Sequence, residues 1–306
     1  MLERFLPKPI YESVAHNLSL SRLTEIRLRA NRPVVVEYGG YYYLTPLGIS
    51  DESQKAIVCD AVMLNDLVFK ACECSIYSHN EQLKQGFITV SGGCRIGVCG
   101  ELVSEKSEIK TMKNFSSVNV RFPHQVRDCS LNALKYLVDS DGVKNTLIIS
   151  SPGGGKTTFI RDLAFQLSDK HLCRNVLIVD ERNEIAATLN GCPQLDVGMH
   201  TDVIAGCSKM FGLESGIRTM KPDVIVLDEL ANPDDIVAVS YCVGAGVKLV
   251  ATAHAKNLQE LKRKFAIAPL LENNVFERFV VLSEREGSGT LDGVFDINQK
   301  CIYMGQ

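Results

Sequence analysis

The chain has 306 residues, of which 45% are hydrophobic and 23% are charged. At about 150 residues per domain, this length predicts two domains with sizeable cores, and the composition excludes a disordered, collagen-like or coiled-coil protein. The 33 basic and 36 acidic side chains give a net charge of −3, so the chain has no overall positive charge that would attract nucleic acid or anionic lipid.

The first ten residues do not have the pattern of a secretory signal, because Glu3, Arg4 and Lys8 interrupt the stretch that would have to be apolar. No later stretch approaches the roughly 18 consecutive apolar residues that a transmembrane helix needs. We therefore expect a cytoplasmic protein. The 11 cysteines form no Cys-x-x-Cys pair, and we expect reduced, mostly buried thiols rather than a zinc site or disulfides.

Residues 1–142 predict a small α+β domain. Short runs with strand patterns predict a small sheet over residues 25–29, 33–37 and 41–44. Two further runs, 87–90 and 95–99, flank Gly92 and Gly93 and predict a hairpin. Apolar residues at helical spacing predict helices over 51–72 and about 130–139, whereas the polar stretch 101–114 predicts a loop. Asp141 and Gly142 precede a new apolar run, and we place the domain boundary there.

Residues 143–306 predict an α/β domain with a parallel sheet and a short β-rich tail. Four apolar runs predict buried strands over 146–149, 176–179, 224–227 and 247–251. The stretches between and after them predict helices over 157–167, about 202–220, 234–243 and 258–265. Apolar strands that alternate with helices are typical of a parallel sheet covered on both faces.

The run Ser-Ser-Pro-Gly-Gly-Gly-Lys-Thr-Thr at residues 150–158 lies between the first of these strands and a helix, as a P-loop does. In a P-loop, backbone N–H groups surround the phosphates, the lysine binds the β- and γ-phosphate oxygens, and the next hydroxyl ligates Mg²⁺. We expect Lys156 to bind phosphate and Thr157 to ligate Mg²⁺. The other predicted nucleotide-binding residues are Ser151, Pro152, Gly153, Gly154, Gly155 and Thr158. The chain departs from the consensus at the first position of the loop, where Ser150 replaces glycine.

Acidic residues end two of the predicted strands. The strand 224–227 leads into Asp228 and Glu229, the pattern of a Walker B strand, so we expect Asp228 to ligate Mg²⁺ and Glu229 to polarise the attacking water. The strand 176–179 leads into Asp180 and Glu181. Glu181 therefore competes with Glu229 for the role of catalytic base, and the sequence does not decide between them.

His254 closes the last apolar strand, at the sheet edge where we expect Lys156. Two interpretations stay open: a sensor of the γ-phosphate, or a histidine bonded only to backbone. An extra strand between the P-loop and the Walker B strand favours the RecA-like or AAA-like branch of P-loop NTPases over small kinases and GTPases. Because the chain also lacks the Asn/Thr-Lys-x-Asp guanine motif, we expect ATP and Mg²⁺ as cofactors.

The motifs resemble the Walker A, Asp, Walker B and His boxes of hexameric type II and type IV secretion ATPases, at residues 150–158, 179–182, 215–229 and 246–254. Further segments resemble the stage III sporulation protein AA family, at residues 25–33, 86–101, 117–122, 180–182 and 196–202. The second resemblance covers nearly the whole chain. The chain departs from the family at Ser150 and at His200, where arginine is more frequent.

The resemblance implies a homo-oligomeric ring, expected to be a hexamer, on the mother-cell side of the forespore membrane. It also implies membrane-embedded sporulation channel proteins as partners. Arginines are candidates for contacting the γ-phosphate across a subunit boundary, and these are Arg27, Arg29, Arg32, Arg121, Arg182 and Arg218. The alternative for each is a surface ion pair of little energetic weight.

Two other functions stay open. A nucleic-acid-dependent P-loop motor would need a basic, aromatic-bearing surface, which the net charge disfavours, and the chain has no strong nucleic-acid signal. A scaffold that binds ATP without turnover is disfavoured by the three acidic residues Asp228, Glu229 and Glu181, although Ser150 is compatible with it.

Overall fold

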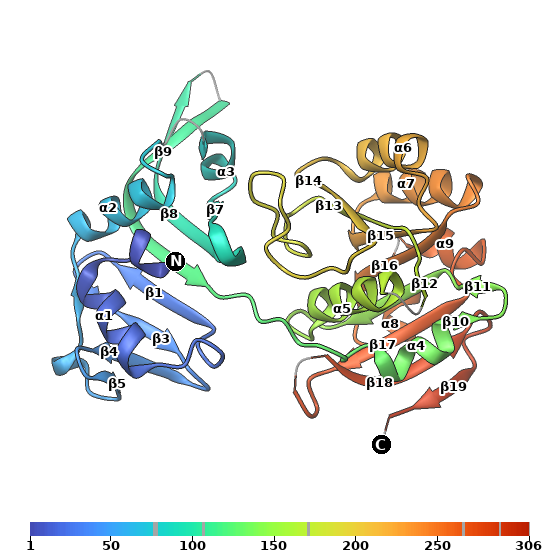
Figure 1. Ribbon diagram of the computed structural model, residues 1–306, viewed down its shortest axis with the longest axis horizontal. Helices are drawn as coiled ribbons and strands as arrows, with labels where there is room; N and C mark the ends of the chain where they lie inside the picture. The colour runs from blue at the N-terminus through green and yellow to red at the C-terminus, as the bar shows by residue number, and fades with distance from the viewer. Residues whose placement is uncertain (76–78, 106–107, 170–171, 265–266, 288, 306) are drawn as a thin grey trace. The chain divides into compact units, whose positions relative to one another are not determined.

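The computed structural model describes residues 1–75, 79–105, 108–169, 172–264, 267–287 and 289–305 (Figure 1). The chain divides into two compact units, Met1–His124 and Gln125–Gln306. This division precedes the boundary expected after Gly142, because helix α4 (Leu131–Leu137) packs Ala133 and Leu137 into the core of the second unit. Among the helices described, none is both long and apolar enough to cross a membrane.

The first unit is built on a seven-stranded antiparallel sheet with the order β5-β4-β3-β1-β9-β8-β7. Its strands are β1 (Glu25–Arg29), β3 (Val35–Glu37), β4 (Tyr41–Thr45), β5 (Gly48–Ser50), β7 (Phe87–Thr89), β8 (Arg95–Glu105) and β9 (Glu108–Arg121). A separate pair joins β2 (Arg32–Pro33) to β6 (Val58–Cys59). The helices are α1 (Lys8–Asn17), α2 (Ala61–Ala71) and α3 (Asn80–Lys84), with 3-10 turns at Leu2–Arg4, Ser53–Lys55 and Ser91–Gly93.

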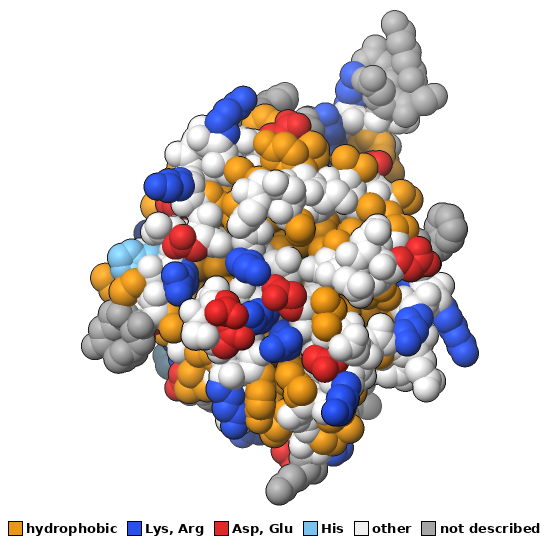
Figure 2. All heavy atoms as spheres, turned by 90° about the vertical axis from the view of Figure 1, so that its right-hand side faces the viewer, with side chains coloured by type: hydrophobic (Ala, Val, Ile, Leu, Met, Phe, Trp, Pro, Cys, Tyr) orange, Lys and Arg blue, Asp and Glu red, His pale blue; other side chains and the backbone are white. Residues whose placement is uncertain are grey.

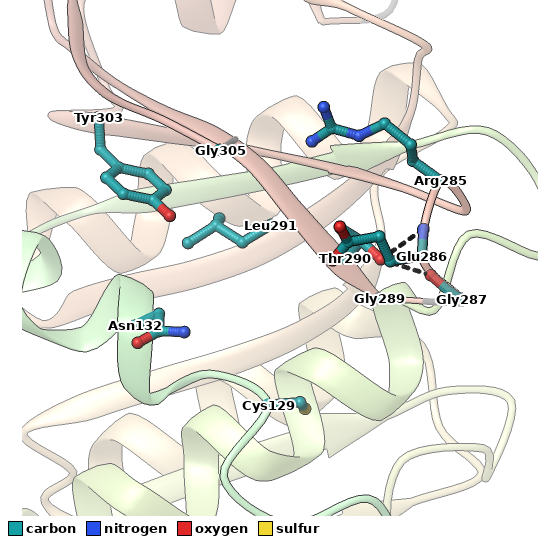
Figure 3. A pocket seen from close by; sticks show the side chains of 10 residues that line it. All are labelled: Cys129, Asn132, Arg285, Glu286, Gly287, Gly289, Thr290, Leu291, Tyr303 and Gly305. Atoms are coloured by element: carbon teal, nitrogen blue, oxygen red, sulfur yellow. Dashed lines mark hydrogen bonds between the residues drawn. The ribbon is translucent and has the colours of Figure 1, made fainter.

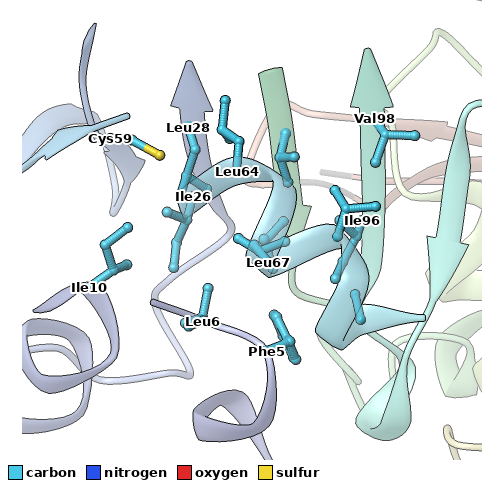
Figure 4. Packing of buried hydrophobic residues seen from close by; sticks show 14 of the residues in the cluster. Phe5, Leu6, Ile10, Ile26, Leu28, Cys59, Leu64, Leu67, Ile96 and Val98 are labelled. Atoms are coloured by element: carbon cyan, nitrogen blue, oxygen red, sulfur yellow. The ribbon is translucent and has the colours of Figure 1, made fainter. Parts of the chain in front are cut away.

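The core of the first unit lies on one face of this sheet. Alternate residues of β1, Ile26 and Leu28, point into it and pack with Leu64 and Leu67 of α2 and with Ile10 of α1 (Figure 4). All five side chains are fully buried, and burial of each such side chain is worth about 1.5–3 kcal/mol. The small sheet expected from the alternating pattern is therefore present.

The loop expected over residues 101–114 is wrong, because this stretch forms parts of β8 and β9. The two strands pair antiparallel beyond the rest of the sheet, with Glu101 opposite Lys113 and Leu102 opposite Met112. Oppositely charged side chains facing each other across a two-stranded ribbon favour pairing. Charged residues here mark solvent-exposed strands rather than a loop.

Two helices of the first 142 residues are shorter than expected. Within 51–72, α2 begins only at Ala61, because the Asp60 carboxylate caps it and accepts the Met63 N–H at 2.7 Å. Near 130–139, α4 ends at Leu137 and the chain turns into β10 (Val138–Asp139), which pairs with β11 (Gly142–Val143).

The second unit is built on an eight-stranded sheet with the order β14-β13-β15-β16-β12-β17-β18-β19. Neighbours from β14 to β17 are parallel, and the last two pairs are antiparallel. The strands are β12 (Thr146–Ser150), β13 (Val176–Asp180), β14 (Thr201–Ala205), β15 (Val224–Glu229), β16 (Lys248–His254), β17 (Arg278–Ser283), β18 (Thr290–Asp296) and β19 (Cys301–Met304). The parallel sheet and the β-rich tail are as predicted.

Helices cover both faces of this sheet because its strands are apolar on both sides. They are α5 (Lys156–Ser168), α6 (Lys209–Met220), α7 (Pro233–Gly244), α8 (Leu258–Lys262) and α9 (Ala268–Glu272). Ile148 of β12 packs with α4 and α5, whereas Leu147 and Ile149 pack with α6 to α9. Phe265, the predicted end of the helix at 258–265, lies outside the described residues.

The helix expected over about 202–220 is partly wrong, because β14 occupies its first residues. Val203 and Ile204 are β-branched, and β14 pairs in parallel with β13 at the edge of the sheet. The helix α6 begins at Lys209, where the Ser208 hydroxyl caps it by accepting the Phe211 N–H at 3.4 Å. The β-branched pair was the sequence signal for this strand.

Candidate nucleotide site

The carboxyl ends of β12, β13, β15 and β16 bring the predicted site residues to one edge of the sheet. Ser150 at the end of β12 lies opposite His254 at the end of β16, and Glu229 lies opposite Thr252. Ligand sites of open parallel sheets lie at this edge. The sheet thus collects residues that are far apart in the sequence.

The loop between β12 and α5 has the backbone that a P-loop needs. Gly153 and Gly155 have φ values of +82° and +83°, which residues with side chains rarely adopt. At Gly154, a Cβ atom would lie 2.6 Å from the Ser150 hydroxyl oxygen and 3.1 Å from the Ser151 carbonyl oxygen. The loop therefore excludes side chains at these three positions, and Thr157 and Thr158 follow in the first turn of α5.

Lys156 begins α5 and is buried, with 8% of its surface exposed. Its ammonium group donates to the carbonyl oxygens of Ser150 and Ser151 at 3.3 and 3.2 Å and to the Ser150 hydroxyl at 3.2 Å. Burial lowers the pKa of Lys156 to about 8, and the negative charges of Glu229 and Asp228 oppose this shift. Ser150, the departure from the consensus, thus contributes a hydroxyl to the lysine.

His254 connects Lys156 to Glu229. Its Nδ1 lies 2.7 Å from the Lys156 Nζ, and its Nε2 lies 3.1 Å from the Glu229 carboxylate. Because an ammonium can only donate, Nδ1 accepts and Nε2–H donates, so these contacts require the neutral imidazole. Burial, then the Lys156 charge, lowers the pKa of His254. His254 therefore bonds to side chains as well as backbone.

The Asp228 carboxylate is buried, and its Oδ2 has no hydrogen-bond partner among the residues described. Burial raises the pKa of Asp228 to about 6. A buried oxygen without a partner is a suitable ligand for a hard cation, and Mg²⁺ sites combine one or two such oxygens with phosphate oxygens. The described residues contain no cluster of three or more His, Cys, Asp or Glu that could hold a metal alone. The Asp228 oxygen thus fits an ion shared with phosphate, and Thr157 in the first turn of α5 remains the predicted second ligand.

Glu181 lies at the end of β13 in a separate ion-pair network. Its carboxylate lies 2.6 Å from the ammonium of Lys209, which is almost fully buried and also lies 3.3 Å from Asp235. Asp235 in turn accepts the N–H groups of Ala231 and Asn232 at the start of α7. The sequence gives no signal for Lys209 beyond its position in a predicted helix, so its place in the site could not be predicted.

Asp180 holds the chain that follows β13. Its fully buried carboxylate accepts the N–H groups of Glu184, Ile185 and Ala186 at 2.9 to 3.0 Å. Burial raises the pKa of Asp180, against these hydrogen bonds. Because Glu181 is the next residue along the chain, the hydrogen bonds of Asp180 also fix the point at which Glu181 leaves the sheet.

The predicted arginines are placed differently. Arg182 is exposed and its guanidinium lies 3.6 Å from Glu229. Arg218 is exposed in the last turn of α6, which precedes the amino end of β15, so within one chain it lies at the opposite sheet edge from Lys156. His200 is exposed before the amino end of β14, where its carbonyl accepts the Val176 N–H. Neither Arg218 nor His200 faces the P-loop of its own chain.

Comparison with known proteins agrees with this architecture. A model of the family described as "Sporulation stage III, protein AA" matches residues 8–302. Stage III sporulation protein AA of Bacillus subtilis (strain 168) is 34% identical over 280 residues, which cover 90% of this chain and 87% of that protein. The family resemblance found in the sequence is confirmed.

Two solved structures have the same fold. The ATPase DotB of Legionella pneumophila superposes with a TM-score of 0.55 at 15% identity, over 91% of this chain and 76% of that chain. The ATPase DotB of Yersinia pseudotuberculosis gives a TM-score of 0.55 at 10% identity, over 90% and 76%. At these identities the similarity concerns the fold, and it confirms the predicted α/β P-loop NTPase core with a smaller amino-terminal domain.

Proposed function

We propose that this chain, which belongs to the stage III sporulation protein AA family, binds ATP with Mg²⁺ and hydrolyses it. The observation that carries the proposal is the side-chain connection Lys156–His254–Glu229 beside the unpartnered oxygen of Asp228. These groups supply phosphate binding, metal binding and a base at one edge of the sheet. That combination is what P-loop hydrolysis requires.

The loop residues 151–158 would bind the phosphates through backbone N–H groups, and Lys156 would bind the β- and γ-phosphate oxygens. Thr157 and Asp228 would hold Mg²⁺, which when bound neutralises charge on the phosphates. Lys156 and His254 would report on the γ-phosphate together, since any movement of the ammonium toward phosphate weakens the hydrogen bond that it donates to His254 Nδ1.

Glu229 is the better candidate for the base. One imidazole separates its carboxylate from the phosphate-binding lysine, whereas a carboxylate oxygen of Glu181 is held by Lys209 at 2.6 Å. Glu229 would orient a water whose oxygen bonds to the γ-phosphorus while the bond from that phosphorus to the β–γ bridging oxygen breaks. The water proton passes to the carboxylate, and the products are ADP and inorganic phosphate.

We further propose that the chain works as a homo-oligomeric ring, a hexamer, in the cytoplasm of the mother cell. Its partners would be membrane-embedded sporulation channel proteins, and hydrolysis would energise or assemble that channel. Family membership supports this role. In a ring, Arg182 or Arg218 can act on the nucleotide of a neighbouring subunit, where a guanidinium stabilises transition-state charge. On the face drawn in Figure 2, basic and acidic side chains are interspersed, which favours a protein partner over nucleic acid.

The test compares wild type, Glu229→Gln and Glu181→Gln by steady-state ATPase rate and by ATP binding. We expect Glu229→Gln to retain ATP binding and to lose about 10²-fold or more in kcat, because a general base typically contributes a rate enhancement of this size. Glu181→Gln should change kcat by less than about fivefold, because its carboxylate serves the Lys209 network. The reverse order of the two variants would assign the base to Glu181.

Rates measured over a range of protein concentrations test the ring. A rate per subunit that rises with concentration supports assembly-dependent hydrolysis, and a constant rate contradicts it. Saturable ATP binding without turnover at any concentration would contradict hydrolysis and support the scaffold. Single-stranded DNA should leave the rate unchanged, and a large stimulation would support the nucleic-acid motor instead.

A further inference from the structure

A cavity of about 520 Å³ opens beside the P-loop within the second unit (Figure 3). One wall comes from the connection between β17 and β18 and the first residues of β18, and another comes from the end of β19. The third comes from the segment that enters α4 and from the first turn of α4. The residues used below are Cys129, Asn132, Gly289, Thr290, Leu291 and Tyr303. Small-molecule sites in proteins have volumes of about 300–1,000 Å³, so the cavity has the size of a ligand site.

Two contacts join the cavity to the predicted phosphate site. The Gly289 N–H donates to the Gly154 carbonyl oxygen at 3.2 Å, so one wall is bonded to the P-loop itself. The Cys129 sulfur lies 4.0 Å from the carbonyl oxygen of Thr158, in the first turn of α5. The cavity therefore borders both the loop and the beginning of the helix.

The direction of a bound nucleotide follows from these borders. With the β- and γ-phosphates in the loop near Lys156, the α-phosphate lies against the first helical turn and the nucleoside continues past it. The residue that follows the Lys-Thr pair is Thr158, which the cavity wall contacts through Cys129. A nucleoside leaving the P-loop on this side would enter the cavity.

The lining has the chemistry of a site for a base and a sugar. Leu291, Cys129 and the ring of Tyr303 provide apolar surface, and the Tyr303 ring is supported by Tyr136 with ring centroids 5.4 Å apart. Figure 3 shows the amide of Asn132 and the hydroxyl of Tyr303 directed toward the same space. An amide offers one donor and one acceptor together, the pair that matches an adenine edge.

We propose that this cavity holds the adenine and ribose of bound ATP, with Asn132 hydrogen-bonded to the base. The inference rests on the proposed function. It assigns nucleotide recognition to residues outside the P-loop motifs, in the β-rich tail and at the start of α4. The opposite wall is kept in shape by Thr290, whose hydroxyl donates to the Gly287 carbonyl oxygen at 2.7 Å and accepts the Glu286 N–H at 3.3 Å.

The experiment measures the affinities of ATP, GTP and inorganic tripolyphosphate for the full chain by calorimetry. Tripolyphosphate reports on the P-loop alone, because it has the phosphates without the nucleoside. The variants are Asn132→Ala, which removes the amide, and Asn132→Trp, which fills the cavity from an exposed position on α4. The matched control is Lys135→Trp, one helical turn further along α4 and not part of the cavity lining.

We expect Asn132→Trp to weaken ATP about tenfold or more and to leave tripolyphosphate within twofold of wild type. Asn132→Ala should reduce the preference for ATP over GTP, and Lys135→Trp should change neither affinity. Thermal unfolding of each variant checks that the fold is intact. Unchanged ATP affinity in a folded Asn132→Trp variant, or equal losses for ATP and tripolyphosphate, would overturn the inference. If wild type binds neither ligand, the proposed function itself fails, which is a different result.

Discussion

His254 is the residue through which the P-loop lysine and Glu229 contact each other. Replacement of His254 by alanine removes both contacts but leaves the phosphate-binding N–H groups of the loop in place. We expect kcat to fall about 10- to 100-fold and ATP affinity to change less than about threefold. The reason is that His254 positions the side chains of Lys156 and Glu229, whereas the loop N–H groups bind the phosphates. Single-turnover hydrolysis and equilibrium binding measure the two effects separately.

The control for this prediction is His200→Ala. His200 is exposed and lies before the amino end of β14, away from the P-loop of its own chain. Its replacement should leave kcat within about twofold of wild type in the same assay. Equal losses in the two histidine variants would contradict the role given to His254.

Ser150 and Gly154 are linked by close packing in the P-loop. A Cβ atom at Gly154 would lie 2.6 and 2.8 Å from the Oγ and Cβ of Ser150, distances that real contacts do not show. We expect Gly154→Ala to weaken ATP binding at least about tenfold, since the loop must shift to admit the methyl group. The double variant Ser150→Gly/Gly154→Ala should recover part of this loss, because both of these contacts are with the serine side chain.

A double-mutant cycle of ATP affinities measures the coupling. Recovery will be incomplete, because the Ser151 carbonyl oxygen also lies 3.1 Å from the added atom. If the two changes are additive instead, the serine does not constrain Gly154, and the departure from the P-loop consensus has no steric consequence.

At the scale of secondary-structure elements, the sequence predicted those whose own residues determine them. The strand β12, the glycine-rich loop and α5 follow from local pattern and turn chemistry, as do the buried strands that end in Asp180, Glu229 and His254. The outer parts of β8 and β9 did not follow, because their polar residues are stabilised as strands by pairing with each other, and β14 was missed although Val203 and Ile204 gave a signal for it. Pairing of that kind overrides local propensity.

Within the candidate site, the sequence predicted the residues that belong to recognised motifs. It did not predict the buried polar side chains that hold the elements of the site in place. Lys209, Arg161 and Asp162 lie on helices at positions that no short motif marks, and each is buried against a polar partner contributed by another element. The sheet order β15-β16-β12 also places His254, at the end of the middle strand, between Glu229 and the P-loop. The spacing of residues along the chain does not predict this strand order.

Asp162 joins the P-loop helix to the segment that begins the second unit. Its buried carboxylate accepts the N–H groups of Asp128 and Ser130 at 2.9 and 2.8 Å and the Ser130 hydroxyl at 2.6 Å. Replacement by alanine leaves three donors without this acceptor, so we expect the free energy of unfolding to fall by about 3 kcal/mol. Urea denaturation of the full chain checks the value.

Gln166→Ala is the matched control on the same helix. The Gln166 amide donates to the Asp128 side chain at 3.0 Å, but this contact is exposed to solvent. Its loss should cost less than about 1 kcal/mol. A loss as large as that of Asp162→Ala would mean that any change on this face of α5 destabilises the unit, and the specific contribution of the carboxylate would be refuted.

At the scale of the whole second unit, Glu277 connects the amino ends of three central strands. It precedes β17, its carboxylate accepts the Asn145 N–H before β12 at 2.9 Å, and it pairs with Lys248 of β16 at 3.0 Å. Burial by itself would raise the pKa of Glu277, but the hydrogen bonds from Asn145 and Lys248 and the charges of Lys248 and Lys144 outweigh it and lower the pKa below its ordinary value of 4.5. The ionised carboxylate therefore stabilises the sheet.

The pH dependence of stability follows from the sign of this shift. Because the pKa of Glu277 is lower in the folded state, its stabilisation is complete above the unfolded value near 4.5 and is lost as the pH falls through the folded value. Glu277→Gln should thus lower the free energy of unfolding by about 1–2 kcal/mol at pH 7, and the difference from wild type should shrink as the pH falls below about 4.5. The control is Glu272→Gln at an exposed position, which should match the stability of wild type at pH 7. A difference between wild type and Glu277→Gln that stays constant from pH 7 to pH 3 would show that the carboxylate's ionisation does not stabilise the unit.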